Sequence, residues 1–234
     1  MKLSIVIPVY NEAPNIAAVL ARVGAANPNG FEKELIVVDD GSTDGTSRIL
    51  EQYASHNGCR IIRHPFNRGK GAALKTGFGA AGGDYILIQD ADHEYDPADW
   101  PALLEPIIQK PAETGFGSRV LKENNVPVNK IYFYGGILVS KIFNALFSTD
   151  FTDIATGYKV FPRRLVLPLL DSRSDDFVFD AIELTYLLSR HGRVVEVPIR
   201  YRARSRREGK KLNWWHGIRC VMAIGRIKLG IGRN

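Results

Sequence analysis

The chain has 234 residues, of which 45% are hydrophobic and 24% are charged, a composition typical of a folded globular protein. Its length suffices for one sizeable core and favours one or two domains. Cys59 and Cys220 stand alone, which argues against a disulfide framework or a zinc site and favours a reducing, cytosolic environment. The N-terminus has no basic segment followed by an apolar one, so we expect no signal peptide.

The net charge of +6 is unevenly distributed along the chain. Residues 200–234 contain eleven Lys or Arg and one acidic residue, a net charge of +10, which leaves −4 for the remainder. A basic tail of this kind suits nucleic acid, an anionic membrane surface or a phosphorylated substrate.

The first 118 residues alternate strand and helix patterns. We expect strands at 3–9, 34–40, 59–64, 84–92 and 114–119, and helices at 11–23 (with Asn11 as N-cap), 44–53, 70–81 and 97–109. This alternation predicts an α/β fold with a mostly parallel central sheet and helices on both faces.

The second part of the chain is less regular. We expect a loop at 120–128, an apolar helix at 130–147, an amphipathic helix at 177–189 and a strand at 194–201. The helix at 130–147 is too short and too interrupted by Gly, Ser, Lys and Asn for a membrane span.

One buried strand pattern, YILIQDADHEYDP at 85–97, ends in alternating carboxylates. If the strand continues, Asp90, Asp92 and Glu94 lie on one face and repel one another unless a positive charge lies among them. Carboxylate oxygens are ligands that Mg²⁺ and Mn²⁺ prefer, often together with phosphate oxygens. The spacing therefore predicts a divalent metal site.

Two other strand patterns also end in polar residues. The first is PVYNE, with Pro8, Tyr10 and Glu12, and the second is VVDDGSTDGT, with Asp39 and Asp40. Each alone is typical of an ordinary turn or helix cap. Together, in order and each after a strand, they indicate a ligand site at the carboxyl edge of a parallel sheet.

Familiar nucleotide-binding loops are missing from the sequence. No Gly-x-Gly-x-x-Gly follows the first strand, and no P-loop is present. The segment NRGKGAALKTG at 67–77 has different glycine spacing and is typical of a turn into a closely packed helix.

The ordered series IVIPVYNE, VVDDGSTDGT, NRGKGAAL, QDADHEYDP, GSR and TGYKVF resembles the family-2 glycosyltransferases. Within them, VPIRYRARSRREGKKLNWWHGIR resembles the polyprenyl-phosphate glycosyltransferases, relatives of dolichol-phosphate mannosyltransferase. The resemblance covers roughly residues 2–220. It implies a GT-A fold, a nucleotide-sugar donor, a divalent metal and inversion at the anomeric carbon.

The resemblance also implies roles for particular residues. The metal ligands would be Asp90, Asp92 and Glu94, although relatives often have Gln at the third position. The donor-binding residues would be Pro8, Tyr10, Glu12, Val38, Asp39, Asp40, Arg68, Lys70, Asp90, Ala91 and Asp92. The catalytic residues would be Asp92, Asp153, Arg119, Arg204 and Lys211, and the acceptor phosphate would meet Arg119, Arg204, Lys210 and Lys211.

Several of these residues also have ordinary interpretations. Arg119 is either a surface residue or a phosphate ligand, and Asp153 either caps a helix or faces the acceptor. Asp180 and Glu183, three residues apart on a helix, are either active-site carboxylates or partners of the basic tail. Arg204, Lys210 and Lys211 either belong to a solvated charged face or close over the donor diphosphate and the acceptor phosphate.

We expect a catalytic domain at 1–200, followed at 201–234 by a basic acceptor loop and an amphipathic helix. Trp214, Trp215, Ile218, Val221, Met222 and Ile227 define an apolar face, which either docks on the core or lies on a membrane surface. The helix at 130–147 would supply a second membrane contact. This combination predicts peripheral attachment at the cytoplasmic face.

The leading hypothesis is an inverting transferase that moves a sugar from UDP or GDP to a polyprenyl phosphate, with Mg²⁺ or Mn²⁺ as cofactor. The second keeps the fold and donor but uses a saccharide hydroxyl, as in cell-wall or surface-polysaccharide synthesis. A nucleic-acid-binding module would explain the basic tail but not the carboxylates, so we expect no nucleic-acid partner. A catalytically inactive relative is a further alternative, although every core carboxylate is present. The sugar, the base and the oligomeric state stay open.

Overall fold

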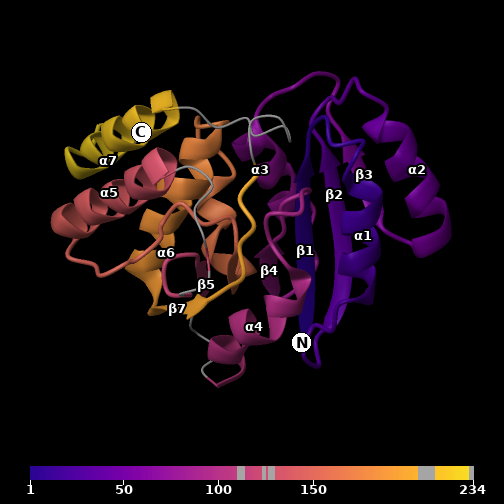
Figure 1. The fold of residues 1–234 in the computed structure, drawn as a ribbon, viewed down its shortest axis with the longest axis horizontal. Helices are drawn as coiled ribbons and strands as arrows, with labels where there is room; N and C mark the ends of the chain where they lie inside the picture. Colours follow the sequence, from indigo (N-terminus) through magenta and orange to yellow (C-terminus); the bar gives the residue numbers. More distant parts are fainter. Residues whose placement is uncertain (110–113, 123–124, 126–129, 205–213, 232–234) are drawn as a thin grey trace.

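In the computed structural model, which describes residues 1–109, 114–122, 125, 130–204 and 214–231, a seven-stranded sheet is covered by helices on both faces (Figure 1). The strands are β1 (Lys2–Val9), β2 (Glu32–Asp39), β3 (Arg60–Arg63), β4 (Tyr85–Ile88), β5 (Thr114–Ser118), β6 (Lys159–Pro162) and β7 (Val194–Pro198), in the order β3-β2-β1-β4-β6-β5-β7. Only β6 is antiparallel to its neighbours in this sheet. The expected α/β fold with a mostly parallel sheet is confirmed.

The first half of the chain follows the predicted alternation. The helices are α1 (Ile16–Ala25), α2 (Thr46–Asn57) and α3 (Lys70–Ala80). Alternate residues of β1 enter two hydrophobic clusters: Ile5 and Ile7 pack with residues of α1, and Val6 packs with residues of α3. Because both faces of β1 are buried, its sequence reads as a nearly continuous apolar run.

The second half contains most of the irregular structure. A 3₁₀ turn (Pro97–Asp99) precedes α4 (Trp100–Gln109), and α5 (Lys130–Phe147) precedes β6. Two further 3₁₀ turns (Arg163–Leu165 and Leu167–Leu169) and a π-helical turn (Phe179–Leu184) lead into α6 (Thr185–His191), and α7 (Trp214–Lys228) ends the described fold. Helices α5 and α7 lie side by side (Figure 1), joined by a hydrogen bond from Lys228 to the Leu146 carbonyl. None of the described helices is long and apolar enough to span a bilayer.

Several sequence expectations need correction. Asn11 is not a helix cap: it has a positive φ of 49°, its side chain accepts a hydrogen bond from the Thr43 amide, and α1 begins only at Ile16. The fourth strand ends at Ile88 and not at residue 92, and the last strand ends at Pro198 and not at 201. The helix expected at 177–189 begins as a π-helical turn, in which a period of 3.6 does not hold.

The antiparallel strand β6 connects the two halves of the sheet. It pairs with β4 over three residue pairs, Tyr85 with Pro162, Ile86 with Phe161 and Leu87 with Val160. On its other side it pairs with β5. The sequence pattern did not predict this strand, because KVFP is only four residues long and has no alternation.

Strand β6 also carries a buried charge. Lys159 is completely buried, and its Nζ lies 2.9 Å from Oδ1 of Asp180, which is 1% exposed. Lys70, the first residue of α3, lies 2.9 Å from the other Asp180 oxygen. Burial alone would raise the pKa of Asp180, but the charges of Lys159 and Lys70 outweigh it and lower this pKa to about 2.

Replacing Asp180 with Asn should destabilise the protein by about 3–5 kcal/mol, because two lysines then lack their counter-ion in the interior. The lowered pKa means that Asp180 stabilises the fold above about pH 4 and that this contribution is lost as pH falls towards 2. The difference in urea unfolding free energy between wild type and Asp180→Asn should therefore shrink over that range. Combining Asp180→Asn with Lys159→Met should recover part of the loss, and equal stability of wild type and single variant at pH 7 would contradict the prediction.

Candidate active site

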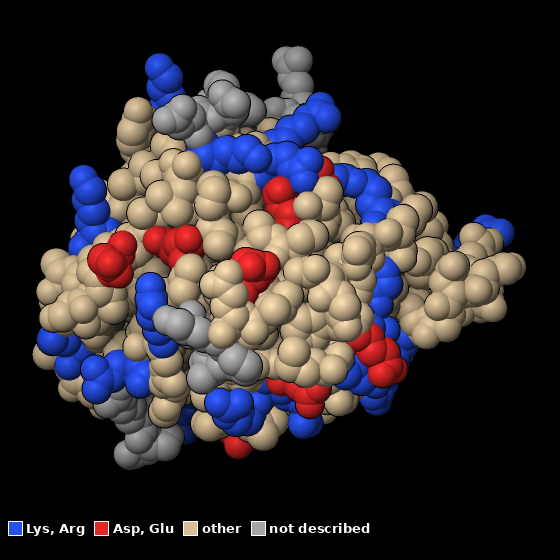
Figure 2. Space-filling view, turned by 90° about the horizontal axis from the view of Figure 1, so that it is seen from below, with Lys and Arg blue, Asp and Glu red and all other residues tan. Residues whose placement is uncertain are grey.

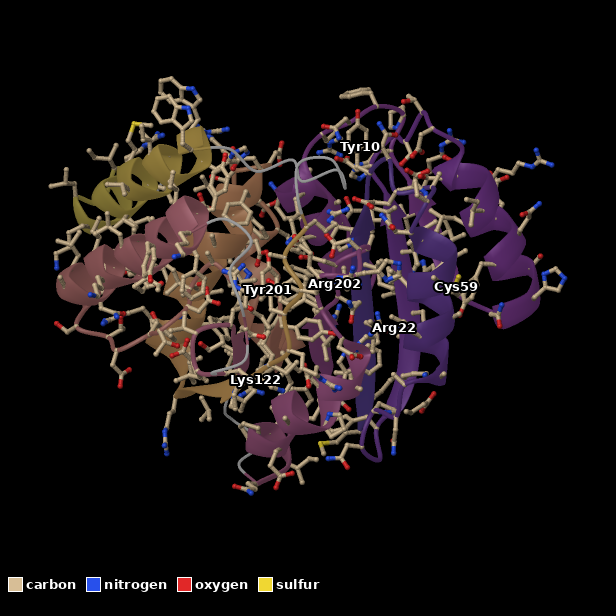
Figure 3. All side chains as sticks on the ribbon, viewed as in Figure 1. Tyr10, Arg22, Cys59, Lys122, Tyr201 and Arg202 are labelled. Atoms are coloured by element: carbon tan, nitrogen blue, oxygen red, sulfur yellow. The ribbon has the colours of Figure 1, made fainter. Side chains whose placement is uncertain are left out.

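The polar segments that follow β1, β2 and β4 meet at the carboxyl edge of the sheet. In-register parallel pairing of β1 with β2 and with β4 brings their ends together, so that Glu12, Asp39 and the segment 89–94 lie on one side of the molecule. Tyr10 lies at this end of β1, while Tyr201 and Arg202, which follow β7, lie nearer the middle of the view in Figure 3.

The carboxylates after β4 do not follow strand geometry, contrary to the premise of the sequence argument. The chain turns at Gln89, whose buried side chain accepts hydrogen bonds from Trp100 Nε1 at 3.2 Å and from the Tyr158 hydroxyl at 2.6 Å. Asp92 then accepts a hydrogen bond from the Glu94 amide. Alternation in a strand therefore does not explain why Asp90, Asp92 and Glu94 lie near one another.

Arg204 supplies the positive charge among the carboxylates. Its NH2 lies 2.6 Å from Asp92 Oδ2, and its NH1 lies 3.1 Å from each oxygen of Glu12. Its backbone amide donates to Glu94 Oε1 at 2.8 Å. One arginine from the segment after β7 thus joins the ends of β1 and β4.

Asp92 is the most perturbed member of the carboxylate group. It is 8% exposed, and burial together with the charges of Asp90 and Glu94 raises its pKa to about 7, although Arg204 opposes this shift. A second cation would therefore be stabilised beside Asp92.

Asp90 lies in a separate ion pair. Its Oδ1 is 2.8 Å from Lys70 Nζ, and Lys70 also contacts Asp180. The backbone of Gly157 packs against Asp90 so closely that a Cβ at that position would lie 2.5 Å from Asp90 Oδ2. Lys70, a predicted donor-binding residue, thus lies beside a predicted metal ligand, and Gly157 leaves room for the Asp90 carboxylate.

The predicted metal ligands Asp90, Asp92 and Glu94 all belong to the described residues. No group of three or more His, Cys, Asp or Glu side chains in them is arranged to hold a metal ion alone. Asp90 and Asp92 nevertheless fit a hard cation, because Mg²⁺ is usually bound through one or two carboxylates together with substrate phosphates. A role for Glu94 as a third ligand stays a prediction, since its oxygens accept from the Tyr201 hydroxyl and the Arg204 amide.

The predicted nucleoside-binding residues have different surroundings. Asp39, 1% exposed, accepts hydrogen bonds from the Ser42 amide and the Ser47 hydroxyl. The side chains of Val38 and Ala91 are buried in the two hydrophobic clusters, so that only their backbones could reach a donor. Pro8 and Tyr10 are partly exposed near the end of β1. Donor contacts of these residues stay predictions.

Arg119 and Asp153 form a paired unit. Arg119 Nε and NH2 lie 2.6 and 2.7 Å from the two oxygens of Asp153, a bidentate geometry. The Arg119 guanidinium also lies 5.0 Å from the ring centre of Tyr201. The Asp153 and Thr152 amides donate to Glu196 of β7, which fixes this loop.

The sequence pattern did not predict a role for the tyrosines of this region. Tyr95 stacks on Tyr158 with ring centres 4.7 Å apart, and Tyr201 packs against Tyr95 at 5.3 Å. Tyr201 also donates to Glu94. These tyrosines connect the carboxylates with Arg119. The only sequence signal for this connection was the position of Tyr201 beside the basic tail.

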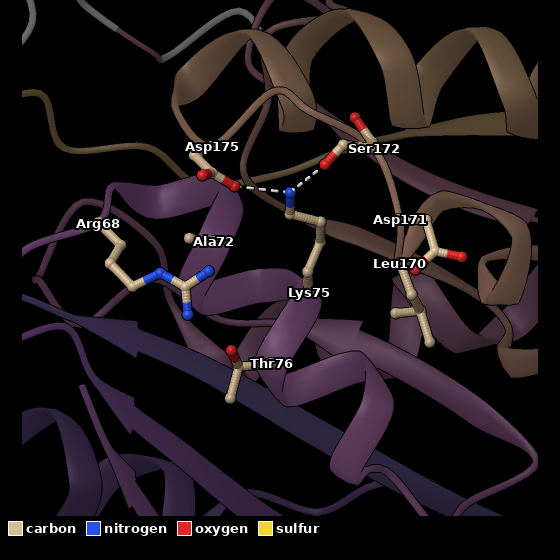
Figure 4. A pocket seen from close by; sticks show the side chains of 8 residues that line it. All are labelled: Arg68, Ala72, Lys75, Thr76, Leu170, Asp171, Ser172 and Asp175. Atoms are coloured by element: carbon tan, nitrogen blue, oxygen red, sulfur yellow. Dashed lines mark hydrogen bonds and ion pairs between the residues drawn. The ribbon is translucent and has the colours of Figure 1, made fainter. Parts of the chain in front are cut away.

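Other predicted residues lie elsewhere. Glu183 accepts hydrogen bonds from Ser172 and Ser174. These partners lie outside the carboxylate group and outside the basic tail. Lys210 and Lys211 lie outside the described residues. Arg68 lines a pocket of about 350 Å³ between α3 and the segment 170–175, together with Lys75 and Thr76 (Figure 4). None of the acidic residues around Arg204 lines this pocket.

On the face shown in Figure 2, Lys and Arg side chains are interspersed with Asp and Glu. An extended basic surface, which nucleic-acid-binding proteins usually have, is not evident on this face.

Comparison with known proteins assigns the chain to a family. The family model described as Glycosyl transferase family 2 matches residues 4–165. The chain is 29% identical to dolichol-phosphate mannosyltransferase of Pyrococcus furiosus over 214 residues, which are 90% of this chain but 59% of that protein. It is 30% identical to undecaprenyl-phosphate mannosyltransferase of Micrococcus luteus over 223 residues, which are 90% of this chain and 87% of that protein.

The fold has a close structural counterpart. Glucosyl-3-phosphoglycerate synthase of Mycobacterium tuberculosis, solved with Mn²⁺, UDP and glucosyl-3-phosphoglycerate, matches with a TM-score of 0.71 and 21% identity over 98% of this chain and 80% of that one. The chain therefore belongs to glycosyl transferase family 2, has the GT-A fold, and resembles the polyprenyl-phosphate sugar transferases of that family.

Proposed function

We propose that this protein transfers a hexose from a UDP- or GDP-sugar to a polyprenyl phosphate at the cytoplasmic face of a membrane, with inversion at the anomeric carbon. The observation that carries the proposal is the group formed by Glu12, Asp92, Glu94 and Arg204 at the carboxyl edge of the sheet. The relatives named for dolichol-phosphate and undecaprenyl-phosphate transfer support the acceptor class.

In this reaction an oxygen of the acceptor phosphate forms a bond with the anomeric carbon while the bond from that carbon to the donor diphosphate breaks. Asp90 and Asp92 would hold Mg²⁺ or Mn²⁺, which when bound neutralises charge on the leaving diphosphate. Lys70 lies 2.8 Å from Asp90 and would contact the same diphosphate. Arg204, now between carboxylates, would turn towards phosphate when a donor and cation occupy the site.

The state of Asp153 favours a phosphate over a saccharide acceptor. A sugar hydroxyl needs a positioned general base, whereas a phosphate oxygen is already largely ionised near neutral pH. Both oxygens of Asp153, the carboxylate predicted to face the acceptor, bind Arg119. Together with Arg204, Arg119 would bind the acceptor phosphate, and transfer to a saccharide hydroxyl remains the second candidate function.

The α5–α7 surface supports membrane attachment. Trp214, Trp215 and Met222 of α7 are each more than half exposed, as are Ile131 and Tyr134 of α5. Exposed Trp and aliphatic side chains on a helix that carries Arg226 and Lys228 in its last turn suit the interface of an anionic bilayer. We propose that these two helices lie on the membrane surface, with the catalytic domain at 1–200 facing the cytoplasm and residues 201–234 forming the acceptor loop and membrane helix.

Purified protein with polyprenyl phosphate and Mg²⁺ or Mn²⁺ should move radiolabel from one UDP- or GDP-sugar into organic-extractable lipid. EDTA should abolish the transfer, and Asp92→Ala should lower kcat by about 100-fold or more, because charge stabilisation at the leaving group is lost. Asp84→Ala, at the opposite end of β4, is the matched control and should stay near wild type. Metal-dependent nucleotide binding without lipid labelling would move the acceptor to a saccharide.

Arg204→Ala should lower kcat/KM for the lipid phosphate by about 100-fold, because a charge-assisted phosphate contact is lost. It should also destabilise the ligand-free protein, since Glu12 and Asp92 then lose their common counter-ion. Added Mg²⁺ should raise the thermal midpoint of this variant more than that of wild type. Arg200→Ala, which breaks ion pairs with Asp96 and Asp99, is the control, and equal responses of both variants would contradict the assignment.

The double variant Trp214→Ser/Trp215→Ser should bind anionic phospholipid vesicles at least about tenfold more weakly than wild type, because burial of each large apolar side chain contributes about 1.5–3 kcal/mol. Vesicle co-sedimentation measures this binding. Phe66→Ser removes a comparably exposed aromatic residue outside α5 and α7 and should have no effect. Unchanged binding of the double variant would exclude α7 as the membrane contact.

A further inference from the structure

Asp40 and His64 form a buried pair beside the site. His64, 5% exposed, lies just after β3, and its Nδ1 is 2.7 Å from Asp40 Oδ1. Its Nε2 is 2.9 Å from the hydroxyl of Thr76 on α3. A neutral imidazole that donates from Nδ1 to Asp40 and accepts from Thr76 at Nε2 satisfies both contacts.

Asp40 directs its carboxylate into the protein. Besides His64, it accepts hydrogen bonds from the backbone amides of Arg68, at 3.0 Å, and Gly69, at 2.8 Å. Asp40 is only 2% exposed. Because three N–H donors occupy a buried carboxylate, little of it is left for a ligand.

These bonds hold the turn from which two predicted donor-binding residues project. Gly69 has a φ of +104°, and a Cβ there would lie 2.3 Å from the Asp175 carbonyl oxygen. The backbone of this turn therefore requires glycine at position 69. Lys70 follows directly and reaches Asp90. Arg68 precedes it and lines the pocket of Figure 4, which Thr76 also lines.

We propose that Asp40 and His64 are positioning residues for the nucleotide-sugar donor. They fix the turn at 67–69 so that Lys70, which follows it, lies where the donor phosphates bind, and they do not touch the donor themselves. The inference rests on the proposed function and departs from the resemblance, which implies that Asp40 contacts the donor. Thr76 orients the imidazole from α3.

The test measures binding of UDP and of GDP, each with Mn²⁺, by calorimetry, together with steady-state transfer. His64→Leu should weaken nucleotide binding about tenfold and raise KM for the donor more than it lowers kcat, because small misplacements of a binding group are costly. His64→Gln should stay close to wild type, since its amide can still donate to Asp40. Thr76→Val should have an intermediate effect, because it removes only the second bond of the imidazole.

Tyr53→Phe is the matched stability control, because it removes one partly buried hydrogen bond, to the Leu20 carbonyl, between α1 and α2. It should leave nucleotide affinity unchanged, and thermal unfolding verifies that each variant is folded. Loss of binding in Asp40→Asn with wild-type binding in folded His64→Leu and Thr76→Val would show that Asp40 contacts the nucleotide directly, and would overturn the inference alone. Failure of the wild-type protein to bind either nucleotide would overturn the proposed function as well.

Discussion

Mutual repulsion among carboxylates is the constraint on which the rest of the site depends. Glu12, Asp90, Asp92 and Glu94 come from two neighbouring strand ends, and in-register pairing of β1 with β4 places those ends together. Burying such a group costs free energy unless cations lie among its members. Arg204 and Lys70 provide them, and each comes from a different part of the chain. Burial, together with the remaining repulsion from Asp90 and Glu94, keeps the pKa of Asp92 raised.

The same requirement explains the buried charges behind the site. Lys70 can bind Asp90 only if its own position is fixed, and Asp180 fixes it from the core side. Asp180 in turn is held by Lys159 on the antiparallel strand. A chain of alternating charges thus extends from the partly exposed Asp90 into the core, so that the site and the fold of the second half depend on each other.

The sequence predicted the first half of the fold well and the second half less well. Long apolar runs and polar strand ends identified β1, β2 and β4 and the residues after them, because those signals are local. Strand β6 was not predicted, since four buried residues have no diagnostic period. The segment carrying Asp180 was predicted as an ordinary amphipathic helix, and only its π-helical start was missed. The sequence also could not predict the partners of Arg204 and Arg119. Arg204 lies 192 positions from Glu12 and Arg119 lies 34 positions from Asp153, and contacts over such separations depend on the topology of the fold.

Asp40 illustrates why a motif that identifies a site does not by itself assign the role of each residue within it. The pair Asp39–Asp40 marks the end of β2, but neighbouring residues of a chain point in different directions. Asp39 binds its own turn through Ser42, while Asp40 binds His64 and the start of α3. The two carboxylates differ in the donors that surround them, and the sequence pattern does not identify these donors.

The short pairing of β6 with β4 has a consequence for how the molecule can open. In the described part of the sheet, these three residue pairs alone join β3, β2, β1 and β4 to β6, β5 and β7. Both hydrophobic clusters extend across this junction, one on each face of the sheet, so that separation of the two halves there would expose apolar residues of both clusters. A substrate that touches both halves would oppose that separation, because it binds only the joined state. Substrate occupancy would then slow amide hydrogen exchange in the residues that pair at this junction.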